Sequence, residues 1–368
     1  MARAGGVMKR GKLFRDRHFA EALGWTAHEP VGWRAILGAA LGVAVPAAIG
    51  LLSGRATIGF AVAMGAMLFG GPDHAEHGAG RRSLREIFAS AVFVGFAPPI
   101  ATLCASWRWG DAVAILIVTI LAAVSGYSRP FAVAATRFIA FLVMSMSIMS
   151  QPGGHAGGVA LLLGIGSIWA AIVRVGLRQA KVPSLAPVAT AVAARDPTRR
   201  QRIARLKRVL RTVDGWQYPI RLALALGVSS IVRHLWPDQH FSWVLVTAAL
   251  LVERQPEAMP VKTTQRALGV VLGVALTGLV LAEIRSPFAI AALVCLLATL
   301  RPWLRARNYL AYSAVMTPLI LLVMDLGRPI GGDVLIDRLV ATLIGSAIVV
   351  GVNWLAVRFV VRKPDGGQ

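Results

Sequence analysis

Residues 334–357 read VLIDRLVATLIGSAIVVGVNWLAV and carry only two charges, Asp337 and Arg338. At a rise of 1.5 Å per residue, an α-helix of this length crosses the roughly 30 Å hydrocarbon core of a bilayer. The stretch therefore predicts a transmembrane helix. If similar runs recur along the chain, the protein is a polytopic helical membrane protein.

Similar runs do recur along the chain, each ended by charges, Gly or Pro. Together with the first they predict about twelve transmembrane helices, some of which extend into polar flanks because their apolar part is short. The other runs are residues 33–53, 56–71, 87–107, 111–125, 130–150, 157–175, 219–235, 241–252, 267–284, 287–300 and 309–324.

The composition excludes a soluble protein. Of the 368 residues, 56% are hydrophobic and only 15% are charged, whereas a soluble chain has about 25% charged residues. The two cysteines, Cys104 and Cys295, lie inside apolar runs and offer neither a disulfide framework nor a zinc-binding spacing. We interpret both as packing residues.

The net charge of +22 follows the predicted topology. Lys and Arg gather in alternate loops, for example in residues 174–221 and 301–307, while the loops between them hold one Arg or none. This positive-inside pattern places both termini in the cytoplasm. Residues 1–32 are basic but lack the apolar core of a cleavable signal peptide. A nucleic-acid partner is not expected, because successive phosphates require a contiguous basic surface.

The apolar runs divide into two sets of six, which defines the predicted organisation. We expect an all-α polytopic membrane protein with a cytoplasmic basic N-terminal segment (1–32) and a first six-helix half (33–178). A cytoplasmic basic amphipathic linker (179–216), a second six-helix half (217–361) and a cytoplasmic tail (362–368) follow.

The two halves share sequence features. Arg34 follows Trp33 at the start of the first half, and Arg221 follows Tyr218 at the start of the second; a basic loop follows the second helix of each half. Because six is an even number, such repeats share one orientation and are related by an axis along the membrane normal. The alternative is that similar composition mimics repetition.

The linker contains a predicted basic helix. Asp196 and Pro197 suit an N-cap and a first helical position, and apolar residues from Ile203 to Val213 then form one stripe opposite Arg and Lys. Such a helix either lies along the anionic inner leaflet or the helix bundle, or is a solvated linker.

Motifs of enzyme chemistry are not found in the sequence. It contains no Gly-x-x-x-x-Gly-Lys-Ser/Thr, no Gly-x-Ser-x-Gly and no His-Glu-x-x-His, so we expect neither an enzyme nor a cofactor. The segment 73–77, DHAEH, resembles a metal cluster but is better explained as an exposed polar turn in a Gly-rich loop. No metal site is expected. The same loop faintly resembles the second loop of major facilitator transporters, which makes that family a weaker alternative.

Ionisable residues at membrane depth are costly and usually have a partner or a function. Arg137 lies about 10 Å from the start of its helix, too deep to reach the surface easily. Its guanidinium suits a substrate carboxylate or a structural salt bridge, and we weigh the two equally. Glu253 and Arg338 lie nearer helix ends, where local pairing is favoured over a functional role.

Proline pairs mark two predicted helix breaks. Pro98-Pro99 lies within the third run and Thr317-Pro318 within the eleventh. Because proline frees a backbone carbonyl, both are expected to break their helices, and broken helices often line transporter binding sites.

Several short stretches of the second half follow one another in a specific order across residues 218–354. They are 221–227 (RLALALG), 241–247 (FSWVLVT), 253–256 (ERQP), 264–269 (TQRALG) with Gly273, 307–309 (RNY) with Thr317-Pro318, and Arg338 with Gly345. In this order the second half resembles the fusaric acid resistance protein-like, or aromatic acid exporter, family of integral membrane proteins.

The resemblance implies an inner-membrane exporter of small organic, in particular aromatic, carboxylic acids that is driven by the proton gradient. In that reading Trp243, Thr317, Pro318, Pro98 and Pro99 join Arg137 in binding substrate. Glu253 and Arg338 are the candidates for coupling. Well-known members have a sizeable cytoplasmic domain between their halves, whereas this chain has only residues 179–216 there.

The expected partners are the bilayer of the bacterial inner membrane and small organic anions. A periplasmic adaptor protein and a second copy of the chain are further candidates. The competing function is a membrane scaffold or assembly subunit that does not transport and whose basic linker recruits other proteins.

The topology predicts that residues 179–216 are cytoplasmic. Alkaline phosphatase fused after Ala193 should therefore be inactive, because the enzyme needs the oxidising periplasm to form its disulfides. Strong phosphatase activity from that fusion would contradict the whole topology.

Overall fold

The computed structural model describes residues 23–25, 31–70, 84–149, 156–177, 198–236, 241–254, 259–325 and 332–360. Within these residues the regular structure is entirely helical. The first half contains α2 (Trp33–Leu52), α3 (Ala56–Phe69), α4 (Leu84–Gly95), α5 (Ala97–Ala105), α6 (Gly110–Val124), η1 (Ser125–Tyr127), α7 (Arg129–Met149) and α8 (Ala156–Gly176). Then follow α9 (Arg199–Leu210), α10 (Val213–Leu235), α11 (Ser242–Leu251), α12 (Met259–Glu283), α13 (Pro287–Arg307), α14 (Tyr309–Asp325) and α15 (Gly332–Val360).

Every predicted apolar run is helical where the structure describes it, and the third is divided into α4 and α5, so the all-α multi-pass membrane fold is confirmed. Among the described residues, eight helices are long and apolar enough to cross a bilayer, with α4 and α5 together forming one of them. Three apolar helices, α3, α11 and α14, are shorter than these eight. Helix α10, which carries Arg221 and Arg233, is also not among the eight. Twelve crossings therefore remain a prediction.

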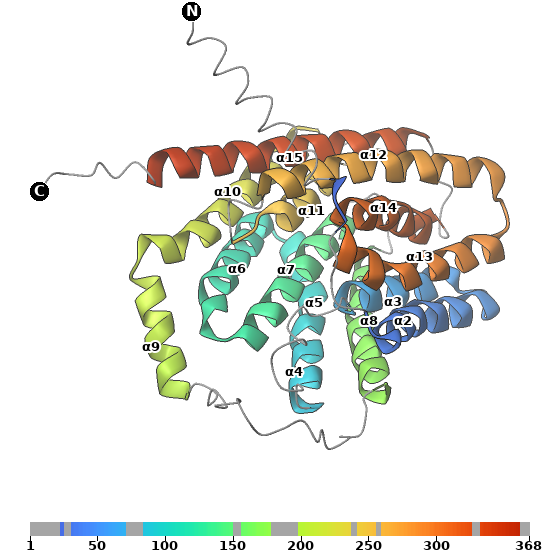
Figure 1. The fold of residues 1–368 in the computed structure, drawn as a ribbon, viewed down its shortest axis with the longest axis horizontal. Coiled ribbons are helices and arrows are strands. Elements are labelled where there is room, and N and C mark those ends of the chain that lie inside the picture. The colour runs from blue at the N-terminus through green and yellow to red at the C-terminus, as the bar shows by residue number, and fades with distance from the viewer. Residues whose placement is uncertain are drawn as a thin grey trace, which may run out of the picture.

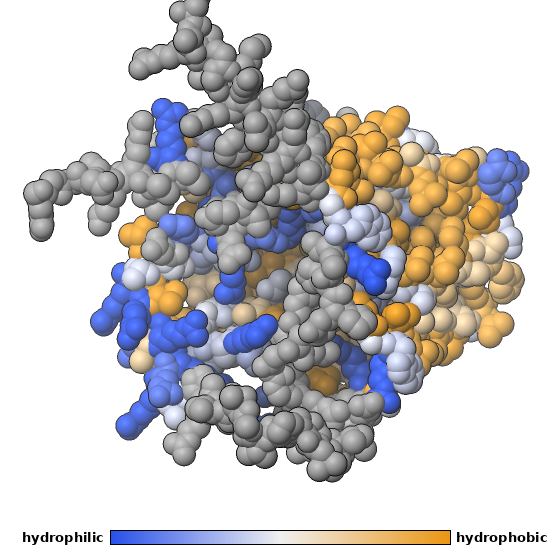
Figure 2. Space-filling view, viewed as in Figure 1, coloured by the Kyte–Doolittle hydropathy of each residue, from blue (hydrophilic) through white to orange (hydrophobic). Residues whose placement is uncertain are grey.

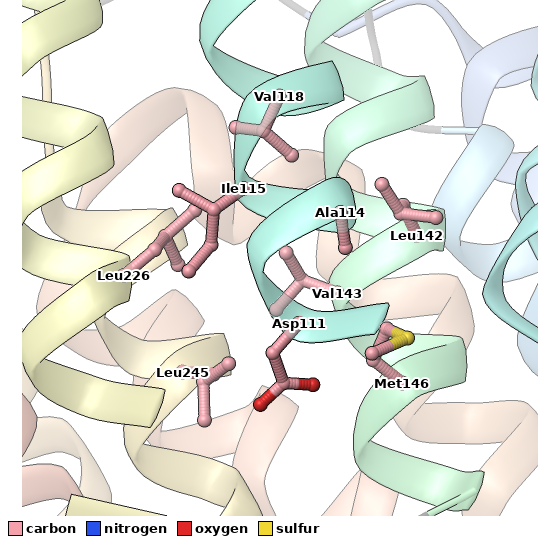
Figure 3. A pocket seen from close by; sticks show the side chains of 9 residues that line it. All are labelled: Asp111, Ala114, Ile115, Val118, Leu142, Val143, Met146, Leu226 and Leu245. Carbon is pink, nitrogen blue, oxygen red and sulfur yellow. The ribbon is translucent and has the colours of Figure 1, made fainter. Parts of the chain in front are cut away.

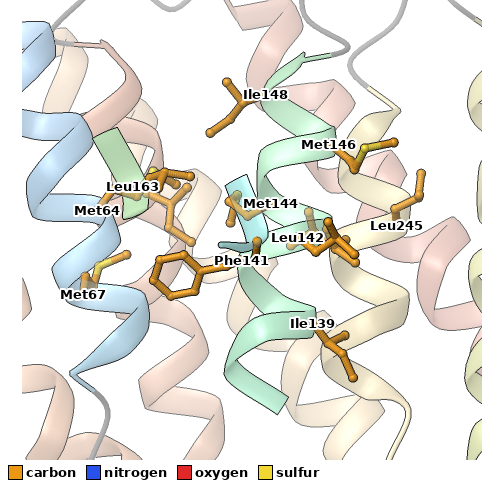
Figure 4. Packing of buried hydrophobic residues seen from close by; sticks show 14 of the residues in the cluster. Met64, Met67, Ile139, Phe141, Leu142, Met144, Met146, Ile148, Leu163 and Leu245 are labelled. Carbon is orange, nitrogen blue, oxygen red and sulfur yellow. The ribbon is translucent and has the colours of Figure 1, made fainter. Parts of the chain in front are cut away.

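Helix α7 forms the centre of the core. Its side chains are buried almost without interruption from Arg137 to Ile148, as expected of a helix surrounded by others. Figure 4 shows Met64 and Met67 of α3 packed on one side of α7, and Leu245 of α11 on the other. Thus α7 connects the first half to the second.

The long helices of the second half form one side of the molecule. In Figure 1, α12 and α15 run side by side along the top, and they are in contact. Helix α9 stands apart at the lower left, where Figure 2 shows hydrophilic side chains, whereas the right-hand part of that view is mainly hydrophobic. The apolar surface is consistent with lipid contact.

Helix contacts follow a matching order in the two halves. In the first, α2 contacts α3 and α8, α3 contacts α8, and α7 contacts α4, α5 and α6. In the second, α10 contacts α11 and α15, α11 contacts α15, and α14 contacts α12 and α13. Contacts between the halves also occur in matching pairs. The contact of α2 with α13 corresponds to that of α10 with α6, and the contact of α3 with α14 corresponds to that of α11 with α7.

The start and end of the linker helix differ from the prediction. Helix α9 begins after Thr198, whose hydroxyl accepts from the Gln201 backbone while the Gln201 side chain accepts from the Thr198 backbone. This capping box satisfies two helix-terminal donors. The predicted cap, Asp196-Pro197, lies outside the described residues. Val213, predicted within this helix, instead begins α10.

Of the two predicted proline breaks, one is found and the other is wrong. The third run is interrupted between α4 and α5, with Pro98 and Pro99 in the first turn of α5. Helix α14, in contrast, continues through Pro318. The Thr317 hydroxyl donates to the Ser313 carbonyl one turn earlier, and Gly273 of α12 leaves room for the Thr317 Cβ and the Pro318 ring, so neighbouring groups accommodate the proline.

Close packing of α3 on α8 depends on glycine. A Cβ at Gly166 would lie 2.2 Å from the Val62 carbonyl oxygen, whereas nothing lies within 4 Å of a Cβ at Gly158, on the same helix. Gly166→Ala should therefore destabilise the protein by about 1–3 kcal/mol through overpacking, and Gly158→Ala should not. Thermal unfolding in detergent checks the pair, and equal melting temperatures for the two variants would contradict the packing.

Candidate functional site

An apolar pocket lies between the two halves, where α6 and α7 meet α10 and α11 (Figure 3). Its cavity volume is only about 20 Å³, room for little more than a water molecule, so the halves must move apart before it can hold an organic ligand. Interfaces between structural units are common places for ligand sites. Its lining comprises Asp111, Ala114, Ile115, Val118, Leu142, Val143, Met146, Leu226 and Leu245.

Asp111 is the one charged side chain of this lining. Its Oδ2 accepts hydrogen bonds from Ser230 Oγ and Arg233 Nη2 of α10, and the Nδ1 of His234 lies 3.7 Å away. The Asp111 and Arg233 side chains are only 22% and 14% exposed. The ion pair is therefore partly shielded from water and joins the halves at the edge of the pocket. We call Asp111, Ser230, Arg233 and His234 the inter-half latch.

Local sequence explains why the carboxylate stands at this position. Asp111 is in the first turn of α6, where an acidic side chain is stabilised by the partial positive charge of the helix N-terminus. Ser230, Arg233 and His234 are three or four residues apart in α10, so they lie on one face of that helix. Packing of α6 on α10 then brings the two faces together.

Arg338 and Trp243, predicted separately for coupling and substrate binding, are in contact. The Arg338 guanidinium carbon lies 3.8 Å from the centre of the Trp243 ring, a cation–π geometry. Both residues are fully buried, with Arg338 at 0% and Trp243 at 1% exposure. The pair joins α15 to α11 inside the second half.

Arg137 lies in a different part of the protein. It is buried on α7, with its guanidinium carbon 4.7 Å from the centre of the Phe69 ring at the end of α3. Nearby, Arg301 of α13 donates to the Met67 carbonyl, satisfying one of the carbonyls left free at a helix C-terminus. Arg137 therefore belongs to a cationic cluster around the end of α3, and its role in substrate binding stays a prediction.

The remaining predicted site residues do not meet at one place. The Glu253 carboxylate pairs with Lys262, at the junction of α11 and α12. Pro98 and Pro99 lie in the first half, and Thr317 is buried against Gly273 of α12. Glu253 thus has the local ion pair that the sequence favoured, and no described contact connects it to Arg338.

Sequence reasoning missed the latch. In the sequence, Asp111 begins one apolar run and Arg233 lies near the end of another, and neither position by itself indicates an ion pair. The available signal was an acidic residue at the beginning of one run and an Arg-His pair at the end of another. Nothing in the sequence, however, pairs α6 with α10.

No metal centre is found in the part of the chain that the structure describes. Within it there is no group of three or more His, Cys, Asp or Glu side chains that could hold an ion. The polar segment 73–77 lies outside the described residues.

Comparison with known proteins concerns the second half. The family model described as fusaric acid resistance protein-like matches residues 224–352. This stretch is a fusaric acid resistance protein-like segment. The resemblance predicted from the sequence is thereby confirmed for about a third of the chain. No curated protein and no solved structure matches the chain.

The fusaric acid resistance-like segment begins within α10 and ends within α15. It therefore includes Trp243, Arg338 and the α10 side of the latch, whereas Asp111 and Arg137 lie outside it. Because this family is a membrane transport family, the match and the apolar helices indicate a transporter-type membrane protein.

The latch predicts a measurable coupling between the halves. Arg233→Ala should destabilise the protein by about 1–3 kcal/mol, because it leaves the partly buried Asp111 carboxylate without its cation. Thermal unfolding of Asp111→Asn, Arg233→Ala and the double variant gives the interaction energy between the two residues. Arg285→Ala, an exposed cation between α12 and α13, is the control and should change little. Additive single effects would contradict the latch.

Proposed function

We propose that this protein is an exporter of small organic acids, in particular aromatic carboxylic acids, in the bacterial inner membrane, with both termini in the cytoplasm. Export is driven by the proton gradient, and the chain acts as a transporter and not as an enzyme. The proposal is supported by the transport family of the second half and by the pocket between the halves.

The proposal includes two six-helix units that share one orientation. Support comes from the matching order of helix contacts in the two halves. Further support comes from Arg34, which donates to the Leu177 carbonyl after α8, and from Arg221, which donates to Asn353 of α15. Each arginine thus ties the first helix of its half to the last. Two units of this kind can tilt against each other around a site between them.

The inter-half latch is the observation that carries the proposed mechanism. The pocket widens when the halves move apart and then takes the apolar part of the substrate, and until then the latch holds the halves together at its edge. Protonation of Asp111 removes the carboxylate's charge and so weakens its attraction to Arg233. This end of the pocket, predicted to face the periplasm, then opens and releases the substrate while a proton enters.

Charged and titratable groups on two other helices face Asp111. Arg233 and His234 face it from α10, and Cys104 of α5 is close enough to interact with its charge. In this mechanism Asp111 replaces Glu253 as the coupling residue, because Glu253 has Lys262 as a partner within its own half.

The alternative is a scaffold that recruits partners through α9. Helix α9 has no buried residue and carries Arg and Lys along its length, so it offers a basic surface to anionic lipid or protein. A scaffold of this kind would move no substrate.

Inside-out vesicles distinguish the two functions. With an acidic lumen, wild-type vesicles should concentrate radiolabelled benzoate, and a protonophore should abolish the accumulation. Passive diffusion works in the opposite direction, since the undissociated acid leaves an acidic compartment. A lack of benzoate accumulation against this diffusion in the wild-type vesicles would favour the scaffold.

Asp111→Asn tests the coupling. This variant should lose gradient-driven accumulation by at least about tenfold, as expected of an essential proton-transfer group, yet still exchange labelled for unlabelled benzoate. Arg285→Ala should retain both activities. Accumulation by Asp111→Asn at the wild-type level would contradict the assignment of Asp111.

A further inference from the structure

A cluster of buried donors lies between α11, α12 and α15, away from the inter-half pocket. Arg338 of α15 stacks on Trp243 of α11, and Arg266 of α12 is close enough for its charge to repel that of Arg338. Arg266 is 4% exposed and Arg338 is fully buried. Two like charges are therefore held together out of contact with water.

Among the described residues, the Arg338 guanidinium has no hydrogen-bond partner. All three of its nitrogens are buried without an acceptor, and so is the Nε1 of Trp243. The same holds for Nε of Arg266 and for Oγ1 of Thr247, one turn from Trp243 on α11. Buried polar groups in proteins are nearly always hydrogen-bonded. These donors therefore have no acceptor in the part of the chain that the structure describes.

Helix packing holds these donors in place. Gly345 lies two turns after Arg338 on the same face of α15, and a Cβ there would come within 2.9 Å of the Thr247 Cβ. The close approach keeps α15 against the face of α11 that carries Trp243 and Thr247. The site is therefore built by rigid helices, which suits precise recognition.

We infer that this cluster binds the carboxylate of a small aromatic acid, with Arg338 as its principal ligand and Trp243 and Arg266 beside it. The inference rests on the proposed function and adds a second binding site for its substrate, separate from the inter-half pocket, within the fusaric acid resistance-like segment. A carboxylate fits because a guanidinium donates to both of its oxygens at once. Its negative charge also offsets the two cations, and the Trp243 ring favours an aromatic neighbour.

Burial adds a kinetic consequence. Because Arg338 is inaccessible, the anion reaches it only when α11 or α15 moves. Binding is then coupled to a conformational change, which is what a transport site requires. The present structure shows this site closed.

Ligand-dependent unfolding of the purified full-length protein tests the site. Saturating benzoate should raise the melting temperature of the wild type by about 3 °C or more through mass action. Benzamide, which has the same ring without the charge, and chloride, an anion without the ring, should each give a much smaller shift. An equal shift with either compound, or no shift with benzoate, would overturn the proposal.

Two variants locate the effect. Arg338→Met, of similar length but uncharged, should lose the benzoate shift and should not lower the melting temperature measured without benzoate, because it removes an uncompensated buried charge. Arg301→Met is the matched control: Arg301 is also buried but donates to the Met67 carbonyl. It should lower the basal melting temperature and retain the benzoate shift.

A conservative variant covers the case in which Arg338→Met does not fold. Arg338→Lys keeps the charge but cannot form the two-pronged contact, so benzoate affinity should fall by about tenfold or more. Unchanged affinity in Arg338→Lys, or a retained shift in Arg338→Met, would overturn the site. If the wild type transports benzoate and either of these results is found, the proposed function stands and only the site is wrong. If benzoate raises the melting temperature of the wild type but is not transported, the proposed function is contradicted and the site is supported.

Discussion

Lipid supplies no hydrogen-bond partner, and the rest of the structure depends on this constraint. It requires helices, and it requires each cation within them to be shielded by another part of the protein. Arg221 donates to Asn353 and to backbone carbonyls after α11, and Arg301 donates to the end of α3. These arginines connect helices that apolar packing alone would hold less specifically.

Two sites depart from this pattern in opposite ways. At the latch, a carboxylate of one half is held by an arginine and a serine of the other, so that a proton acts directly on the contact between the halves. At Arg338 the cation is shielded by Trp243 but has no acceptor among the described residues. The first site suits coupling to protons, and the second suits an anionic substrate.

Sequence predicted the helices far better than the contacts between them. Apolar runs bounded by charge, Gly and Pro are local features, so each run became a helix, and the interruption before Pro98 was predicted from proline chemistry. The uninterrupted α14 was not predictable, because tolerance of Pro318 depends on Gly273 of another helix. The N-cap of the linker helix also differs from the prediction, because Thr198 forms a capping box with Gln201.

The same limit applies to the candidate sites, whose residue types can be found in the sequence but whose contacts cannot. Arg137, Arg338 and Trp243 were identified from residue type and resemblance, but only the fold shows that two of them touch and that the third lies on Phe69. Asp111 was missed because its meaning comes from Arg233, which is distant in sequence and on another half. Pairing between distant segments is tertiary information, which hydropathy does not contain.

The central claim is that protonation of Asp111 separates the halves at the edge of the pocket. Trp109, which precedes α6, and Leu235, at the end of α10, are exposed beside the latch, so spin labels at these positions allow their separation to be measured by pulsed electron paramagnetic resonance. Asp111→Asn mimics the protonated carboxylate, and a His234→Gln background excludes a contribution from that imidazole. The account predicts a longer distance in Asp111→Asn than in the protein that retains Asp111. Identical distance distributions in the two proteins would contradict it.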